Sequence, residues 1–107
     1  MRPQIKDIVE QIAAKFHPEK IILFGSSASG KWNEDSDVDL LVVMNHRGSS
    51  RKQAVKILTA IEYHTPLDLI VQSHKQLLQR IEAGDFFLKE ILEKGTVVYE
   101  QNLSGMG

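Results

Sequence analysis

Apolar residues recur along this chain with two different periods, and these periods predict its helices and strands. Where apolar residues return every three or four positions, one face of a helix is apolar. Four segments have this spacing, over residues 3–16, 50–61, 73–81 and 85–93. Four shorter runs are continuously apolar or alternate with period two, as strands do. They cover residues 20–24, 37–44, 67–71 and 96–99.

Helices and strands alternate in this order, which predicts an α/β or α+β fold. We expect a mixed β-sheet of about four strands covered by helices. His17-Pro18 ends the first helix, because a residue before proline avoids the helical region. Ser49 or Ser50 can cap the second helix, and Lys94-Gly95 favours the end of the last one. Residues 1–100 are expected to form one domain, followed by a flexible tail over residues 101–107.

Composition narrows the class of protein. The net charge is −1, so bulk electrostatics favour neither nucleic acid nor an anionic membrane as a partner. The chain has no cysteine, which excludes disulfides and thiolate metal sites. No apolar run reaches the roughly 20 residues of a membrane span, and the N-terminus lacks the apolar core of a secretory signal. These features predict a cytoplasmic protein.

Three aspartates are the candidate catalytic and metal-binding residues. Asp37 and Asp39 open the second strand and share one face of it, because strand side chains alternate. Adjacent carboxylates suit a divalent cation such as Mg²⁺, although the pair alone also fits a polar strand entry with solvated side chains. Asp68 stands alone in an apolar strand, where a buried charge normally has a partner or a metal. If the two strands are neighbours, three carboxylates converge into a two-metal site.

A glycine-serine pair is the candidate phosphate-binding element. Gly25-Ser26 follows the first apolar strand directly, so its backbone N–H groups come at the edge of the sheet. A simple turn is the alternative. Gly25, Gly30 and Lys31 have nearly the spacing of a P-loop, but Trp32 stands where that motif needs serine or threonine. We therefore reject the P-loop.

The remaining candidate residues have simpler explanations. The four histidines lack the spacing of zinc ligands, and a surface or turn position is expected for each. Arg51, Lys52 and Lys56 are expected to form a solvated helix face, while Arg47 and Lys31 could reach a phosphate. The apolar cluster over residues 86–88 is expected in the core, with part of it available to a partner.

Taken together, these residues resemble the nucleotidyltransferase superfamily that shares its fold with DNA polymerase beta. The chain is most similar to the small stand-alone members known as minimal nucleotidyltransferases. The family pattern is a Gly-Ser pair, an Asp-x-Asp strand and a third carboxylate on a later strand, matched in order by Gly25, Ser26, Asp37, Asp39 and Asp68. Many members carry an arginine shortly after the Gly-Ser pair. Here Ser27 and Ser29 occupy that stretch, and Lys31 could substitute.

The resemblance implies Mg²⁺-dependent transfer of a nucleoside monophosphate, AMP from ATP, to a hydroxyl acceptor. Asp37 and Asp39 would hold one Mg²⁺, and Asp68 would join them on a second. Gly25, Ser26 and Lys31 would bind the triphosphate.

The acceptor is not given by these residues. Larger members carry a second domain that selects it, and 107 residues leave no room for one. The resemblance therefore implies a separate partner, a HEPN-domain toxin, with this chain as the antitoxin that adenylylates it. Two alternatives stay open: an antitoxin that neutralises by binding alone, and a transferase for a small molecule such as an aminoglycoside. A homo-oligomer also stays open.

Overall fold

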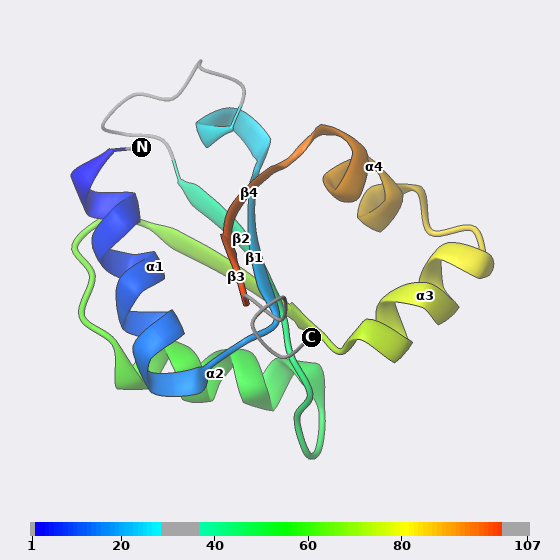
Figure 1. The fold of residues 1–107 in the computed structure, drawn as a ribbon, viewed down its shortest axis with the longest axis horizontal. Helices are drawn as coiled ribbons and strands as arrows, with labels where there is room; N and C mark the ends of the chain where they lie inside the picture. The colour runs from blue at the N-terminus through cyan, green and yellow to red at the C-terminus, as the bar shows by residue number, and fades with distance from the viewer. Residues whose placement is uncertain (1, 29–36, 102–107) are drawn as a thin grey trace, which may run out of the picture.

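A computed structural model describes residues 2–28 and 37–101, which form a four-stranded sheet with two helices on each face (Figure 1). In chain order the elements are α1 (Pro3–Phe16), β1 (Lys20–Phe24), a 3₁₀ turn η1 (Gly25–Ser27), β2 (Val38–Val43), α2 (Ser50–Ala60), β3 (Leu67–Gln72), α3 (His74–Glu82), α4 (Phe86–Lys94) and β4 (Thr96–Glu100). The predicted fold class and the order of its elements are confirmed.

The sheet is mixed, with strand order β3-β2-β1-β4. β1 is antiparallel to both β2 and β4, whereas β2 and β3 are parallel. The C-terminal end of β1 therefore meets the N-terminal ends of β2 and β3. In this register Phe24 pairs with Asp39, and Asp39 pairs with Asp68. The register therefore brings the C-terminal end of β1, the residues that follow it, and the N-terminal ends of β2 and β3 to the same end of the sheet.

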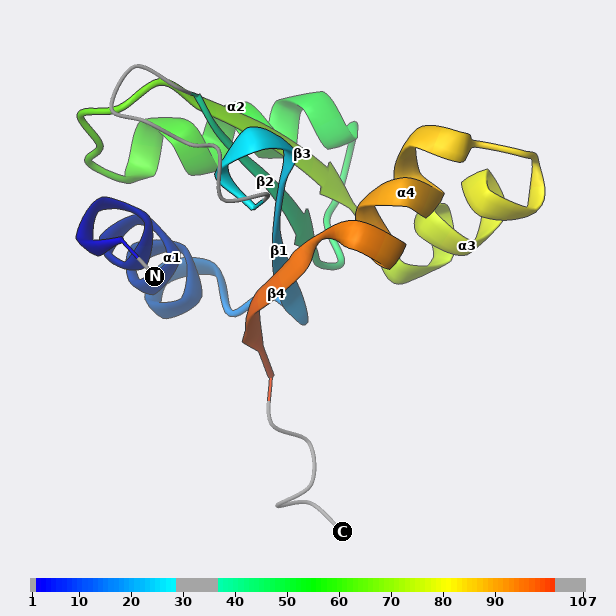
Figure 2. The same cartoon turned by 90° about the horizontal axis from the view of Figure 1, so that it is seen from above.

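Each face of the sheet packs its own apolar core, and the alternation of side chains along β2 decides which residues join which core. Val38, Leu40 and Val42 face α1 and α2, in a cluster with residues such as Ile8 and Ile57. Leu41 and Val43 face α3 and α4, in a second cluster that holds Ile22, Phe24, Leu77, Leu88 and Ile91. Figure 2 shows the two helix pairs on opposite sides of the strands. β1 and β2 are therefore buried on both faces over most of their length.

Short polar side chains begin three of the helices. Ser49 caps α2 by accepting a hydrogen bond from Lys52 N, at 3.1 Å. Ser73 and Gln76 form a reciprocal capping box at the start of α3. Asp85 caps α4 by accepting from Leu88 N, at 3.0 Å. These local bonds fix where each helix starts and hence which of its residues face the sheet.

Gly95 ends α4, as the sequence predicts, but for a different reason. Its φ of −73° is one that any residue adopts, so the left-handed region is not involved. The constraint is space, because a Cβ at this position would lie 2.5 Å from the carbonyl oxygen of Ile91 and 2.6 Å from Cγ2 of Ile22. The glycine therefore lets α4 turn into β4 directly against β1.

The prediction that residues 86–88 belong to the core is wrong for two of the three. Leu88 is buried, but Phe86 is 80% and Phe87 is 55% exposed. Leu88 and Ile91, one helical turn apart, supply the buried face of α4. The two phenylalanines occupy the positions before Leu88, and the ring of Phe87 contacts the sheet, with its centroid 5.9 Å from that of Phe24.

In the described part of the chain, none of the helices has both the length and the apolar character needed to cross a membrane. Residues 102–107, most of the predicted tail, lie outside the described residues.

Candidate active site

Gly25, Asp39 and Asp68 lie close together at one end of the sheet, where β1, β2 and β3 are neighbours. Gly25 directly follows the end of β1, and Asp39 is the second residue of β2. Asp68 is the second residue of β3 and lies directly beside Asp39 in the parallel register. Paired residues of adjacent strands point to the same face, so the two carboxylates lie on the face that α3 and α4 cover farther along the strands.

Asp37 lies immediately before β2, is exposed, and is two positions from Asp39. Asp39 itself is only partly exposed. Burial raises the pKa of Asp39 above its usual value near 3.8, and the charges of Asp68 and Asp37 raise that pKa further. The charges of Asp68 and Asp37 thus act on Asp39, and a divalent cation relieves such repulsion between carboxylates. The predicted convergence of all three carboxylates into one metal-binding group is not seen among the described residues.

Asp68 differs from its sequence-based prediction in one respect. We expected a buried carboxylate, whereas Asp68 is exposed. The reason is that β3 is the edge strand of the sheet, and α3 and α4 cover its face only farther along. An exposed carboxylate beside a partly buried one leaves open the side from which a substrate can approach.

The donor set suits a magnesium ion that shares its ligands with a substrate. Within residues 2–28 and 37–101, no three or more histidine or acidic side chains stand together as a group that could hold a metal ion. Mg²⁺ in proteins is commonly bound by one or two carboxylates and completes its shell with phosphate oxygens and water. Asp39 and Asp68 side by side, with Asp37 nearby, fit that mode of binding.

Two features of the structure require a glycine at position 25: the conformation of its backbone and the close approach of Asp39. Its φ is +73°, which L side chains rarely adopt. A Cβ here would also collide with Oδ2 of Asp39. The backbone of η1 therefore lies directly against the carboxylate, and this close approach brings together the expected phosphate-binding turn and the candidate metal-binding acid.

Ser26 is exposed within η1, whose turn is closed by a hydrogen bond from Ala28 N to the carbonyl oxygen of Gly25, at 3.1 Å. It follows Gly25, whose backbone lies against Asp39, and its role in phosphate binding stays a prediction. Lys31, the third expected phosphate-binding residue, lies outside the described residues.

A cavity of about 210 Å³ opens beside Gly25, and the sequence analysis did not find it. Its walls come from the end of β1 and from one face of α4: Phe24, Gly25, Phe87, Glu90, Ile91, Lys94 and Gly95. Phe87, Glu90, Ile91 and Lys94 recur at helical spacing, which is the signal that could have placed them on one face. Only the docking of α4 beside β1 turns that face into the wall of a cavity next to the carboxylates.

Comparisons with known proteins show that this chain is similar to members of one family. The sequence model of a family described as "Polymerase beta, Nucleotidyltransferase" matches residues 5–104. "Putative protein adenylyltransferase MJ0604" of Methanocaldococcus jannaschii is 31% identical over 99 residues, 89% of this chain and 94% of that protein. "Putative protein adenylyltransferase MJ0141" of the same organism is 32% identical over 53 residues, 50% of this chain and 54% of that protein.

Among solved structures, one titled as a "putative nucleotidyltransferase" from Sulfolobus solfataricus aligns with a TM-score of 0.63. The alignment covers 92% of this chain and 78% of the other, at 21% sequence identity. At that identity the similarity shows a shared fold only, and this fold is consistent with the mixed sheet and two helical layers described above.

Proposed function

Since the chain belongs to the polymerase beta nucleotidyltransferase family, we propose that it transfers AMP from ATP to a hydroxyl group of a partner protein, with Mg²⁺ as cofactor. One observation carries this proposal. The parallel register sets Asp39 beside Asp68, and the backbone of Gly25 closes against the same Asp39 carboxylate. Acids and a phosphate-binding turn in direct contact are what metal-assisted phosphoryl chemistry requires.

Each residue has a role in this scheme. Asp39 and Asp68, with Asp37 nearby, would hold Mg²⁺ together with the phosphate oxygens of the substrate, and the bound metal would neutralise phosphate charge and lower the pKa of the acceptor hydroxyl. Ser26 and the backbone of Gly25 hold the triphosphate. The acceptor oxygen attacks the α-phosphorus in line, its proton passes to water, and pyrophosphate leaves. Positioning of the two reactants at this edge of the sheet contributes much of the rate enhancement.

The choice of a protein as acceptor is supported by two observations. The relative that aligns over 89% of this chain is itself named as a protein adenylyltransferase. On α4, the helix that lines the cavity beside Gly25, Phe86 exposes most of its side chain, which gives a protein partner an apolar contact. We propose that this partner is a HEPN-domain toxin and that the chain is its antitoxin.

A transfer assay with α-labelled ATP and Mg²⁺ tests the proposal, using the protein with an extract of its source organism. A labelled protein band that disappears when EDTA removes the metal would support it. Label on a small molecule instead would identify a small-molecule transferase. If no fraction acquires metal-dependent label, the proposed activity is wrong and neutralisation by binding alone becomes the better explanation.

We place the base of ATP in the cavity beside Gly25, where the ring of Phe87 can contact it. Base–aromatic stacking contributes about 1–3 kcal/mol, so Phe87→Ala should weaken ATP binding roughly tenfold. The matched control is Phe86→Ala, the adjacent and more exposed ring, which does not line the cavity. Calorimetric titration with ATP and Mg²⁺, without acceptor, measures both variants. Equal losses for the two would contradict this placement.

A further inference from the structure

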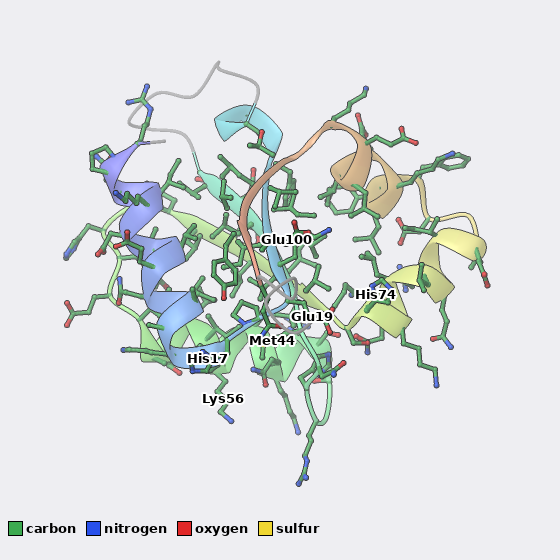
Figure 3. All side chains as sticks on the ribbon, in the orientation of Figure 1. His17, Glu19, Met44, Lys56, His74 and Glu100 are labelled. Atoms are coloured by element: carbon green, nitrogen blue, oxygen red, sulfur yellow. The ribbon has the colours of Figure 1, made fainter. Side chains whose placement is uncertain are left out.

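A second concave site lies at the end of the sheet opposite the carboxylates. It has a volume of about 410 Å³, and four cationic side chains line it: Lys15, Arg47, Lys52 and Lys56. We call these four residues with their cavity the basic pocket. They come from the end of α1, the loop after β2 and the first two turns of α2. Figure 3 shows Lys56 on α2, at the end of the molecule away from η1.

The positive charge of the basic pocket is not balanced by acids. No aspartate or glutamate lines the cavity, and within residues 2–28 and 37–101 none of its four cations forms an ion pair. Five of the other basic residues described do form such pairs. The start of α2 adds to the potential, since its first turn contains no acidic residue and its dipole is positive there. A chain of net charge −1 thus concentrates uncompensated positive charge at one place.

The backbone around the basic pocket is held in place by specific hydrogen bonds. His46, next to Arg47, bonds through Nε2 to Oε1 of Gln76 on α3, at 3.1 Å. On the other side, Nζ of Lys15 donates to the carbonyl oxygen of Ala60, at 2.5 Å, which ties α1 to the end of α2. Oγ of Ser50, the first residue of α2, lies 3.3 Å from the same nitrogen of His46. The loop and α1 are therefore each bonded to α2.

We propose that the basic pocket binds the phosphate groups of a nucleotide, separately from the catalytic site. Its volume lies in the range of about 300–1,000 Å³ that is typical of small-molecule sites. Lysine ammonium groups and the arginine fork suit phosphate oxygens, and Lys52 and Lys56 stand one helical turn apart on the same face. The ring of Phe16 lies in the same wall, which favours a ligand that carries a base over inorganic phosphate. The phosphates can belong to a free nucleotide or to a single RNA strand.

Binding in EDTA separates this site from the catalytic one. Without metal, the three carboxylates repel a triphosphate, whereas the basic pocket needs no metal. We expect saturable binding of ATP or of a short oligoribonucleotide in EDTA, weakening as salt rises. The double variant Lys52→Gln/Lys56→Gln should lose about tenfold in affinity. Its control, Arg51→Gln/Lys75→Gln, removes the same charge from exposed positions outside the cavity and should stay within about twofold.

The outcomes are distinct. Tighter binding of ATP than of the oligonucleotide identifies a free nucleotide as the source of the phosphates, and the reverse identifies a strand. No saturable binding in EDTA, or equal losses in the two double variants, overturns the proposal. If the lysine variant fails to fold, Arg47→Gln on the preceding loop gives the same test. Metal-dependent transfer by the lysine variant should be unchanged, so failure here leaves the proposed transferase activity untouched.

Discussion

Replacing Asp39 by asparagine is expected to lower nucleotidyl transfer by about two to three orders of magnitude, the scale measured when a group that stabilises a transition state is removed. Asp39 is the carboxylate for which the structure shows the most interactions with the rest of the site. It pairs with Asp68 across the sheet, lies against Gly25, and feels the charge of Asp37. An asparagine keeps the shape of the side chain but removes the negative charge that a cation needs. Transfer from α-labelled ATP, with Asp7→Asn on α1 as the control, measures the loss.

The same variant should be at least as stable as the wild type in the absence of metal. Burial and the charges of Asp68 and Asp37 raise the pKa of Asp39 in the folded chain. A raised folded pKa contributes stability below the unfolded pKa, and this contribution is lost as the pH rises through the folded value. At neutral pH the ionised carboxylate is therefore a cost, and asparagine removes it.

Thermal unfolding distinguishes the site from the scaffold. Mg²⁺ should raise the Tm of the wild type by binding the native state, and should do so much less for Asp39→Asn. Without metal, the variant should unfold at the same temperature or slightly higher. Retained transfer by a folded variant would remove Asp39 from the metal site, whereas a large fall in Tm would mean that the residue supports the fold.

Much of the fold follows from local patterns, and for that reason it could be predicted. Helical and strand periodicity identified each element, and period two placed Leu41 and Val43 on one face of β2 and Leu40 on the other, as observed. The caps at Ser49 and Ser73 are local as well, since each serine bonds to a backbone group three residues ahead. These features depend on residues close in sequence.

What could not be predicted depends on which elements become neighbours. Apart from Asp68, residues 67–71 are all apolar, as in a strand buried on both faces. Only the strand order reveals β3 as an edge strand with Asp68 exposed. Phe86 and Phe87 fit a core by composition, but the docking of Leu88 turns them outward. The basic pocket was equally hidden, because its cations come from segments as far apart as Lys15 and Lys56.

The sequence was enough to predict which residues form the candidate site, but not which of them contact one another. The motif singled out Gly25 and Asp39, which stand 14 positions apart in sequence. That the glycine must leave room for the carboxylate is a consequence of the antiparallel pairing of Phe24 with Asp39. This contact connects the two halves of the motif, and it can be tested by adding one methyl group.

Gly25→Ala is expected to abolish transfer while costing only a moderate amount of stability. A residue with a Cβ at φ +73° costs about 1–2 kcal/mol of unfolding free energy. The additional collision is with Oδ2 of Asp39, the end of a flexible side chain, so the carboxylate can rotate away without moving the sheet. That rotation takes Asp39 out of position, and misplacing a catalytic group by about 1 Å can cost roughly 100-fold in rate.

Gly48→Ala is the matched control, because Gly48 has the same φ of +73° and no atom within 4 Å of an added Cβ. Both variants should lose similar unfolding free energy in denaturant titrations, but only Gly25→Ala should lose transfer and the Mg²⁺-dependent rise in Tm. If the two variants keep equal activity, the close approach of Gly25 to Asp39 is not needed for catalysis. If Gly25→Ala is far less stable than Gly48→Ala, the collision is relieved by the backbone, and the loss of transfer would reflect the fold. The comparison therefore separates the role of glycine as a turn residue from its role as the neighbour of a catalytic carboxylate.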